Sequence, residues 1–298
     1  MPIIGSRGAA SAGGFGQRQG ARKYSIDFLV IAGGGSGGGN GGGGGGAGGY
    51  RTSYGTSGGS SPAESKIDLT VGKTYTITVG AGAPTSPNND IGSNGNPSEI
   101  IGVGVSLTSL RGGGTQTPIG DEPCGSGSGR YRNGGATQTA IQGTAGQGSN
   151  GGTNGPPQDN CAGGGGGAGS VGGNASNSTG GTGGNGLSSN ITGSPATRAG
   201  GGGGGTRSGT TAGNGSGGGG NGGNGTGPGS AASATGAGGG GGGLGNGSGG
   251  TGGAGGGGMI VLRIPTAEYS GTTTGSPTVA TDGSDTVVTY SGSGSYTA

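Results

Sequence analysis

Residues that could take part in chemistry are few in this chain, and they form no recognisable site. The sequence contains no histidine, which excludes Ser-His-Asp and Cys-His catalysis and leaves little basis for a zinc site. Its carboxylates are scattered, and no spacing among them marks a calcium-binding loop. They include Asp121, Glu122, Asp159, Asp282 and Asp285. We therefore predict a protein that is not an enzyme and that holds no metal or cofactor.

The two cysteines, Cys124 and Cys161, are 37 residues apart in loop-like sequence. A disulfide between them would close a long loop and, in a chain-entropy treatment, would add about 3–4 kcal/mol to the stability of the fold. Two reduced thiols fit the sequence equally well. Both alternatives stay open at this point.

Glycine accounts for 99 of the 298 residues, and in places two glycines alternate with one other residue. The pattern occurs at 180–186, 219–225 and 249–255. A period of three belongs neither to the α-helix nor to the β-strand. It is the period of the polyproline-II helix, which has no internal hydrogen bonds. We predict stacked polyglycine-II helices whose main chains bond to one another, with the third residue (Thr, Asn or Ala) facing an outer surface.

Composition argues against the usual interpretations of a glycine-rich chain. Charged residues make up only 8% of the sequence, which is low for a disordered region. Collagen needs single glycines at every third position and abundant proline, whereas this chain has glycine runs and 13 prolines. Apolar residues make up only 24%, so a large hydrophobic core is excluded. Backbone hydrogen bonds, each worth about 1 kcal/mol net, would have to stabilise the glycine arrays.

The charge balance gives no argument for nucleic acid or for an anionic membrane as a partner. The net charge is +2, from 13 basic and 11 acidic residues. No apolar run is long enough to cross a bilayer, so no membrane insertion is expected. The first residues contain no continuous apolar stretch of the kind that marks a secretory signal.

Several short segments alternate apolar with polar residues and are rich in β-branched and aromatic side chains, which predicts β-strands. Gly72-Lys73 is expected to form a hairpin turn between 66–71 and 74–79, and Gly102 and Gly104 are expected to form bulges. Glycine disfavours helix by about 1 kcal/mol per residue relative to alanine. The predicted strands are 24–32, 66–71, 74–79, 98–110, 259–264, 278–281 and 286–290.

The apolar segments lie towards both ends of the chain, and the glycine arrays lie mainly between them. The predicted fold class is all-β and irregular: a small β-domain from both chain ends, stacked polyglycine-II helix arrays that project from it, and no α-helix. We divide the chain into four parts. They are an N-terminal docking arm at 1–23, β-strands with the first glycine run at 24–111, polyglycine-II arrays with variable loops at 112–258, and C-terminal strands that complete the β-domain at 259–298.

Tyrosine and arginine side chains occur in the breaks between glycine arrays. Both residue types anchor many binding surfaces, and loops on a rigid scaffold commonly carry recognition. The alternative is that these side chains cap the ends of the arrays or bind loop carbonyl groups. The candidate receptor-contact residues are Tyr50, Tyr54, Arg130, Tyr131, Arg132, Arg198 and Arg207.

Four segments resemble, in order, glycine-rich tail and adhesin proteins of bacteriophages. The first is IDFLVIAGGG at 26–35, which resembles the opening EYLVVAGGG of that family. The others are GGYR at 48–51, LTVGKTYTITVGAG at 69–82 and GMIVLRIPT at 258–266. The order of the segments is more specific than any one of them.

The resemblance implies a virion protein, often at the tail fibre or its tip, of the kind found in marine and cyanobacterial phages. Receptor-binding adhesins of some tailed phages similarly use stacked polyglycine helices to present variable loops. The expected partners are other virion proteins, bound through residues 1–23 or the β-domain, and a protein or glycan of the host surface. The expected location is the extracellular particle, with a monomer and a homo-oligomer both open.

Two non-enzymatic alternatives lack a receptor role. The chain could decorate a capsid, or it could be the subunit of an extracellular filament, which would need open head-to-tail contacts. An ice-binding protein is a further alternative, but its third residues should form one uniform flat face. Here they are Asn, Ser and Thr in mixed order.

Overall fold

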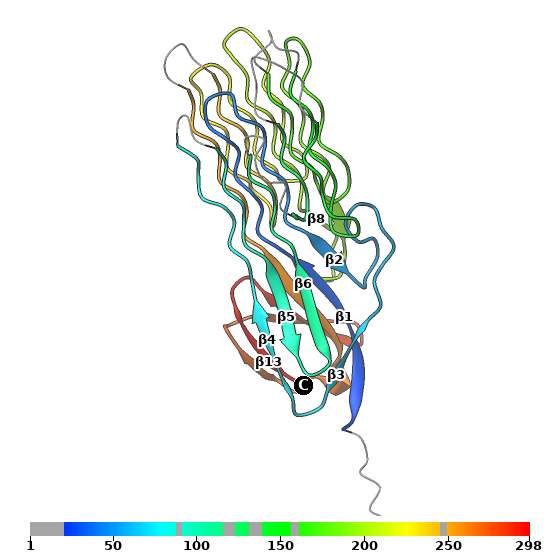
Figure 1. The fold of residues 1–298 in the computed structure, drawn as a ribbon. Helices are drawn as coiled ribbons and strands as arrows, with labels where there is room; N and C mark the ends of the chain where they lie inside the picture. Colours follow the sequence, from blue (N-terminus) through cyan, green and yellow to red (C-terminus); the bar gives the residue numbers. More distant parts are fainter. Residues whose placement is uncertain (1–20, 88–90, 116–122, 131–138, 156–160, 245–248) are drawn as a thin grey trace, which may run out of the picture.

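The computed structural model describes residues 21–87, 91–115, 123–130, 139–155, 161–244 and 249–298. The molecule is elongated, with β-sheets at one end and a bundle of extended segments, here called rods, at the other (Figure 1). The predicted all-β class is confirmed. The described residues form three antiparallel sheets and no α-helix, and their one helical element is the short 3₁₀ turn η1 at Thr266–Glu268.

The larger sheet combines strands from the two ends of the chain. Its order is β11-β12-β9-β1-β2, and β3 also pairs with β1. All of the pairings are antiparallel; for example, Leu29 lies opposite Val261. The strands are β1 (Lys23–Ile31), β2 (Tyr50–Thr52), β3 (Ile67–Thr70), β9 (Met259–Pro265), β11 (Thr278–Asp282) and β12 (Asp285–Tyr290).

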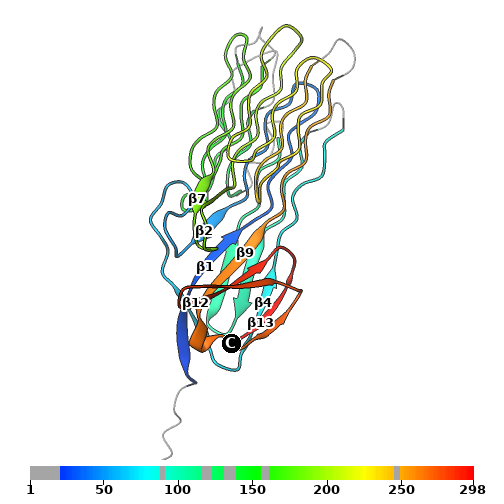
Figure 2. The same cartoon turned by 180° about the vertical axis from the view of Figure 1, so that it is seen from behind.

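A second sheet packs against the first and has the order β10-β13-β4-β5-β6. A separate two-stranded hairpin, β7-β8, lies beside β2 and is labelled β7 in the view from behind (Figure 2). The strands are β4 (Thr74–Thr78), β5 (Ser98–Gly102), β6 (Val105–Ser109), β7 (Leu187–Ser189), β8 (Ala196–Arg198), β10 (Thr272–Thr274) and β13 (Gly294–Thr297).

Strand β1 is buried on both faces, which explains its nearly continuous apolar sequence. Phe28 and Val30 face the core between the two large sheets, where they join Ile77. Leu29 and Ile31 face the opposite side and form a second apolar cluster with residues beside the β7-β8 hairpin. The limited apolar content of the chain is therefore concentrated around one strand.

Most of the predicted strands are confirmed, but two predicted features are wrong. The turn at Val71–Lys73 does not close a hairpin, because β3 pairs with β1 whereas β4 pairs with β5 and β13. The predicted strand 98–110 is a hairpin of β5 and β6 instead of a bulged strand. Gly104 has φ +73° and supplies the left-handed residue that this tight turn needs.

The rods continue from the β-domain and bond to one another through their main chains. The rod at 42–49 lies inside the bundle, and its successive N–H groups donate hydrogen bonds to three different neighbouring rods. Residues 45 and 48 donate to one rod, 44 and 47 to a second, and 46 and 49 to a third. The respective acceptors are the carbonyl oxygens of Gly239 and Gly236, Gly163 and Gly166, and Gly113 and Leu110. The three-residue period predicted from the sequence is thus a period of hydrogen-bond direction.

Inside the bundle there is no room for side chains on successive residues. A Cβ atom built on Gly44 would lie 2.0 Å from the carbonyl oxygen of Gly202. The corresponding distances are 2.2 Å from Gly45 to Gly35 and 2.2 Å from Gly46 to Ser126. Such distances are far below van der Waals contact, so each of the three positions needs glycine.

On the outer rods, the third residue faces solvent as predicted. Thr182 and Asn185 are exposed, whereas Gly180, Gly181, Gly183 and Gly184 are buried. The same holds for Thr251 between two buried pairs of glycines. The assignment of the rods to polyglycine-II helices in particular stays a prediction.

Rods are not confined to the predicted array segment. Residues 33–49, 80–87 and 91–97 also enter the bundle and bond to it, as at Gly34, whose N–H donates to the carbonyl of Gly256 at 2.9 Å. Residues 1–20 of the predicted docking arm lie outside the described residues.

Candidate functional site

The rods reverse direction at turns, and one set of turns gathers at the end of the molecule farthest from the sheets (Figure 1). We call these the distal turns; those that the structure describes are 40–41, 177–178, 207–210 and 225–227. Bridges between rod ends tie them together, including Thr179 with Thr211 and Thr206 with Asn224. Segments far apart in the sequence therefore contribute to one surface.

Arg207 is the predicted contact residue that the structure places on this surface. Its side chain is exposed, and the turn that carries it is held from several sides. The Thr210 hydroxyl donates to the carbonyl oxygen of Arg207 at 2.5 Å, and the Asn224 amide donates to the carbonyl of Thr210. The N–H groups of Gly225 and Leu244 donate to the carbonyl of Thr206 at 3.1 and 2.9 Å. A fixed backbone thus presents a projecting cation.

Three other predicted contact residues are buried, and their assignment to a receptor surface is wrong. The exposed fraction is 0% for Tyr50, 5% for Arg130 and 8% for Arg198. Arg130 donates from Nε to the carbonyl oxygen of Thr139 at 2.5 Å. These side chains support the fold, in line with the alternative that such residues bind loop carbonyl groups.

Tyr50 and Arg198 hold the β7-β8 hairpin against the sheet. Tyr50 lies in the same apolar cluster as Ile191, which follows β7. Burial raises the pKa of Tyr50, and the Ser189 hydroxyl and the Arg198 guanidinium oppose that rise. Burial likewise lowers the pKa of Arg198, and Tyr50 opposes the change. Arg198 also donates to the carbonyl of its own strand residue Ala196 at 3.2 Å.

Tyr54 is half-buried, and its ring packs against the guanidinium of Arg263 of β9. The Arg263 guanidinium lies 5.4 Å from the centre of the Tyr54 ring, within range of a cation–π contact. The same guanidinium binds Asp282 at 2.7 Å and Asp285 at 2.8 Å. Burial alone would lower the pKa of Arg263, but these two carboxylates outweigh that effect and raise it. The remaining candidates, Tyr131 and Arg132, lie outside the described residues.

The structure contains Cys124 and Cys161 as buried thiols and not as a disulfide. Cys124 donates from its thiol to the carbonyl oxygen of Gln142 at 3.2 Å. The backbone of Cys161 pairs with the backbone of Thr206 in an isolated antiparallel β-bridge near the distal turns. Of the two alternatives that the sequence left open, the structure has the reduced one.

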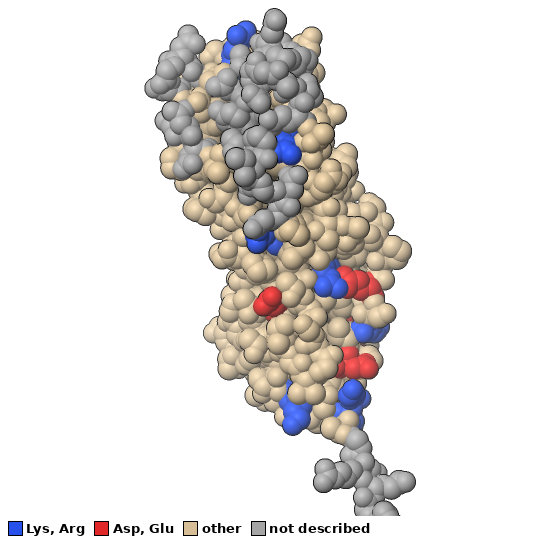
Figure 3. All heavy atoms as spheres, in the orientation of Figure 1, with Lys and Arg blue, Asp and Glu red and all other residues tan. Residues whose placement is uncertain are grey.

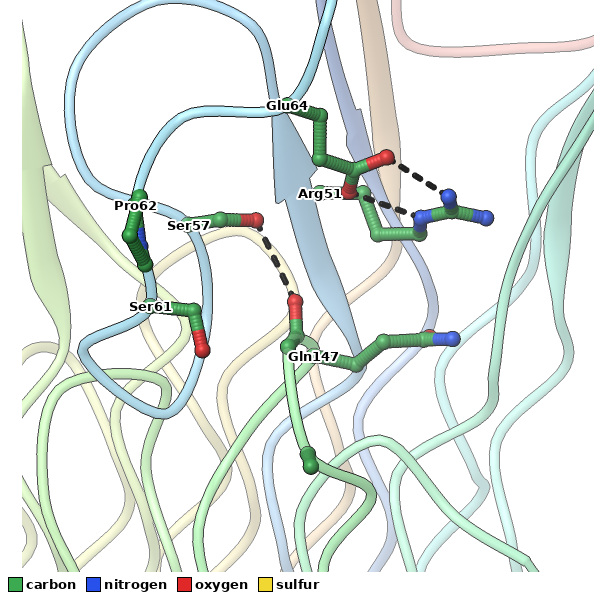
Figure 4. Close-up of a pocket in the computed structure, with 8 residues that line it drawn as sticks. Arg51, Ser57, Ser61, Pro62, Glu64 and Gln147 are labelled. Atoms are coloured by element: carbon green, nitrogen blue, oxygen red, sulfur yellow. Dashed lines mark hydrogen bonds and ion pairs between the residues drawn. The ribbon is translucent and has the colours of Figure 1, made fainter.

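A hollow of about 280 Å³ lies where the loop after β2 meets the turn at 144–147 (Figure 4). Arg51 lies in its wall and binds Glu64 with two hydrogen bonds, Nε to Oε1 at 2.9 Å and Nη2 to Oε2 at 2.6 Å. Its Nη1 donates to the carbonyl of Thr108 at 2.9 Å. The Ser57 hydroxyl lies 3.2 Å from the carbonyl oxygen of Gly146. These polar groups fasten the loop to the rods, and they provide no nucleophile paired with a base.

A family model described as a glycine-rich domain matches residues 6–265. The chain belongs to this family. The match spans the strand β1, all of the rods and the returning strand β9. A comparison with curated proteins gives no match.

In this glycine-rich domain, asparagine side chains complete the hydrogen bonding of rods at the edge of the bundle. A rod at the edge lacks a neighbour on one side, so some of its N–H groups have no main-chain acceptor there. Sequence reasoning missed this role, although each of these asparagines ends a Gly-Gly-Asn or Gly-Ser-Asn triplet, which was a signal for it. The pairs are Gly114 with Asn94 (2.8 Å), Gly143 with Asn150, Thr153 with Asn174, and Gly215 with Asn221 (each 2.9 Å).

The described surface of the glycine-rich domain is mostly uncharged over the rods, and the acidic side chains on the face in Figure 3 lie over the sheets. Within the described residues, no group of three His, Cys, Asp or Glu side chains could hold a metal ion. The same described residues include no helix long and apolar enough to cross a membrane.

Proposed function

We propose that this protein is a structural component of a bacteriophage virion, part of a tail fibre or adhesin, whose distal turns meet the host cell surface. The sequence resemblance described above motivates the assignment to a phage. Membership of the glycine-rich family is consistent with it.

The observation that carries the proposal is that the ends of the described chain and the distal turns lie at opposite ends of the molecule (Figure 1). Tyr24 of β1 and Tyr296 of β13 share a hydrogen bond of 3.0 Å between their hydroxyl groups, and Arg22 binds Glu268. Both ends of the described chain therefore meet in the β-domain, opposite the distal turns (Figure 1). An attachment through the β-domain or the chain ends would leave the distal turns pointing away from the particle.

The rods suit the role of a spacer between the particle and the distal turns, because their shape does not depend on a hydrophobic core. Each rod is held laterally by main-chain hydrogen bonds, as at Gly45, which donates to Gly239 and accepts from Gly202. Turns on a rigid support can change without changing the support, which is the usual arrangement for recognition loops. A variable receptor surface is therefore compatible with a constant bundle.

Replacement of the distal turn 207–210 by a Gly-Ser sequence of equal length tests the proposal. The purified variant is compared with the unchanged protein as a competitor of phage adsorption to host cells. We expect about tenfold weaker competition, which corresponds to the loss of an anchor worth about 1.4 kcal/mol. The matched control replaces 232–235, none of which is buried, in a turn at the other end of the rods, next to Gly236 and the sheet residue Ile31. Equal competition by all three proteins, with unchanged melting temperatures, would contradict a receptor role for this turn.

Immunogold labelling of purified particles tests the location separately. Antibodies against the chain should label tails or tail tips. Labelling of heads would instead support capsid decoration, and the absence of the chain from particles would overturn the virion assignment.

A further inference from the structure

Asparagine followed by glycine recurs along the rods, and this pair can rearrange without a catalyst. The backbone nitrogen of the glycine attacks the side-chain Cγ of the asparagine, because glycine has no side chain to hinder the approach. Ammonia leaves and a cyclic imide remains. Water then opens the imide to aspartate or isoaspartate. The described residues include eight such Asn-Gly steps, which begin at Asn40, Asn94, Asn150, Asn154, Asn185, Asn214, Asn221 and Asn224.

In seven of the eight steps, the glycine N–H is engaged in a hydrogen bond. The nitrogen cannot attack until this bond opens and the proton is lost, so the rod slows the reaction. Six of the acceptors are carbonyl oxygens, and the seventh is a side-chain oxygen. The donors are Gly41 (to Gly242), Gly95 (to Gly112), Gly151 (to Ile141), Gly155 (to Cys161), Gly222 (to Gly213), Gly225 (to Thr206) and Gly215 (to Asn221 Oδ1).

The step at Asn185 differs from the other described steps. The N–H of Gly186 makes no hydrogen bond to any residue that the structure describes, and Asn185 is exposed. The Ser216 hydroxyl donates to Asn185 Oδ1 at 2.7 Å, which draws electron density from Cγ and favours attack on it. The N–H of Asn185 itself donates to Ser170 Oγ at 2.8 Å and holds the residue in place.

We propose that Asn185 is the preferred site of spontaneous deamidation among the described Asn-Gly steps. The bond from Gly186 N to Asn185 Cγ forms as the bond from Cγ to Nδ2 breaks. The nitrogen proton passes to solvent base and Nδ2 leaves as ammonia. Hydrolysis consumes one water, so the net change is asparagine plus water to an acid plus ammonia, with no oxidation or reduction.

The position gives this change a structural consequence. Gly186 directly precedes β7, so Asn185 lies where a rod passes into the hairpin. Deamidation places a carboxylate beside the Ser216 hydroxyl. The isoaspartyl product also inserts a methylene group into the main chain at this junction.

The test incubates the full chain in mildly alkaline buffer and follows each Asn-Gly peptide by mass spectrometry. We expect the Asn185 peptide to convert about fivefold to tenfold faster than the others, since one protecting hydrogen bond is worth about 1–1.4 kcal/mol. In denaturant, the eight rates should converge. Conversion of any other described step at the same rate as Asn185 in the folded chain would overturn the proposal. The steps at 133–134 and 246–247 lie outside the described residues and are left out of the comparison.

A matched pair of variants tests the protective hydrogen bond itself. Asn221→Ala removes the acceptor of the Gly215 N–H without altering the step at Asn214. Conversion at Asn214 should then rise about fivefold to tenfold. Asn174→Ala removes an equivalent side-chain acceptor from Thr153, which follows glycine and not asparagine. It should accelerate no Asn-Gly step, and an unchanged rate at Asn214 in Asn221→Ala would refute the mechanism.

Discussion

At the scale of single residues, the glycines of this protein serve packing more than flexibility. Ordering a glycine costs more backbone entropy than ordering any other residue. The rods accept this cost because neighbouring main chains must approach closely enough to bond. Gly45 illustrates the constraint, since its N–H and its carbonyl oxygen bond to two different rods and a Cβ atom would strike a third.

Alanine substitutions at two glycines separate packing from flexibility. Gly45→Ala places a methyl carbon 2.2 Å from the Gly35 oxygen and should destabilise the fold by about 3 kcal/mol. Gly257 is exposed, and a Cβ atom there would meet no atom within 4 Å. Gly257→Ala should be neutral or stabilise the fold by about 0.5 kcal/mol, because it restricts the unfolded chain. Thermal or denaturant unfolding measures both changes, and similar effects at the two positions would contradict the packing argument.

At the scale of elements, the bundle needs a solution for its outer rods. Edge strands of β-sheets face the same problem of N–H and carbonyl groups that lack a neighbour. Here asparagine side chains take the place of the missing rod, as Asn174 does for the N–H of Thr153 at 2.9 Å. The third residue therefore both faces the solvent and completes hydrogen bonds at the edge.

Removal of one such acceptor should have a local effect. Asn174→Ala should cost about 1 kcal/mol and should speed hydrogen exchange at the amide of Thr153. Thr182 is a comparable exposed third residue whose hydroxyl makes no hydrogen bond with the described part of the chain, so Thr182→Ala serves as the control. If both variants lose the same stability and Thr153 exchange stays unchanged, asparagine does not have this role.

The sequence predicted the periodic features well and the individual roles of polar side chains poorly. The strands β1 and β9 and the exposed third residues follow from periodicity, which local sequence records. The pairing of β3 and β4 with different sheets depends on β1 and β13, which are distant in sequence. The burial of Tyr50 and Arg198 depends likewise on a hairpin more than a hundred residues after β2. Residue type alone could not distinguish a binding surface from a support.

At the scale of the whole molecule, stability should depend on pH through buried tyrosines of the β-domain. Burial raises the pKa of Tyr24 and of Tyr290 above the usual value of 10.0. Tyr24 also shares its hydroxyl hydrogen bond with Tyr296, which raises its pKa further. The ionised form is therefore disfavoured in the folded state relative to the unfolded state.

The sign of the effect follows from these directions. The contribution of each tyrosine is fully present below a pH of about 10, where both states are protonated. It is lost as the pH rises above that value, because the unfolded chain ionises first. Denaturant unfolding at a series of alkaline pH values should show this fall. In Tyr290→Phe the free energy of unfolding should fall less steeply, by about 1.4 kcal/mol per pH unit above about pH 10. An identical slope in the variant and the unchanged protein would contradict a contribution from Tyr290.

The rotation of hydrogen-bond direction along each rod also limits how this protein can change in length. Deleting a single residue within 42–49 would swing every later carbonyl by one third of a turn, away from its own neighbour and towards another. Insertions and deletions inside the bundle should thus survive selection only in multiples of three. Insertions and deletions of a single residue should accumulate at the turns between rods, so related proteins should differ from one another mainly in the lengths of these turns.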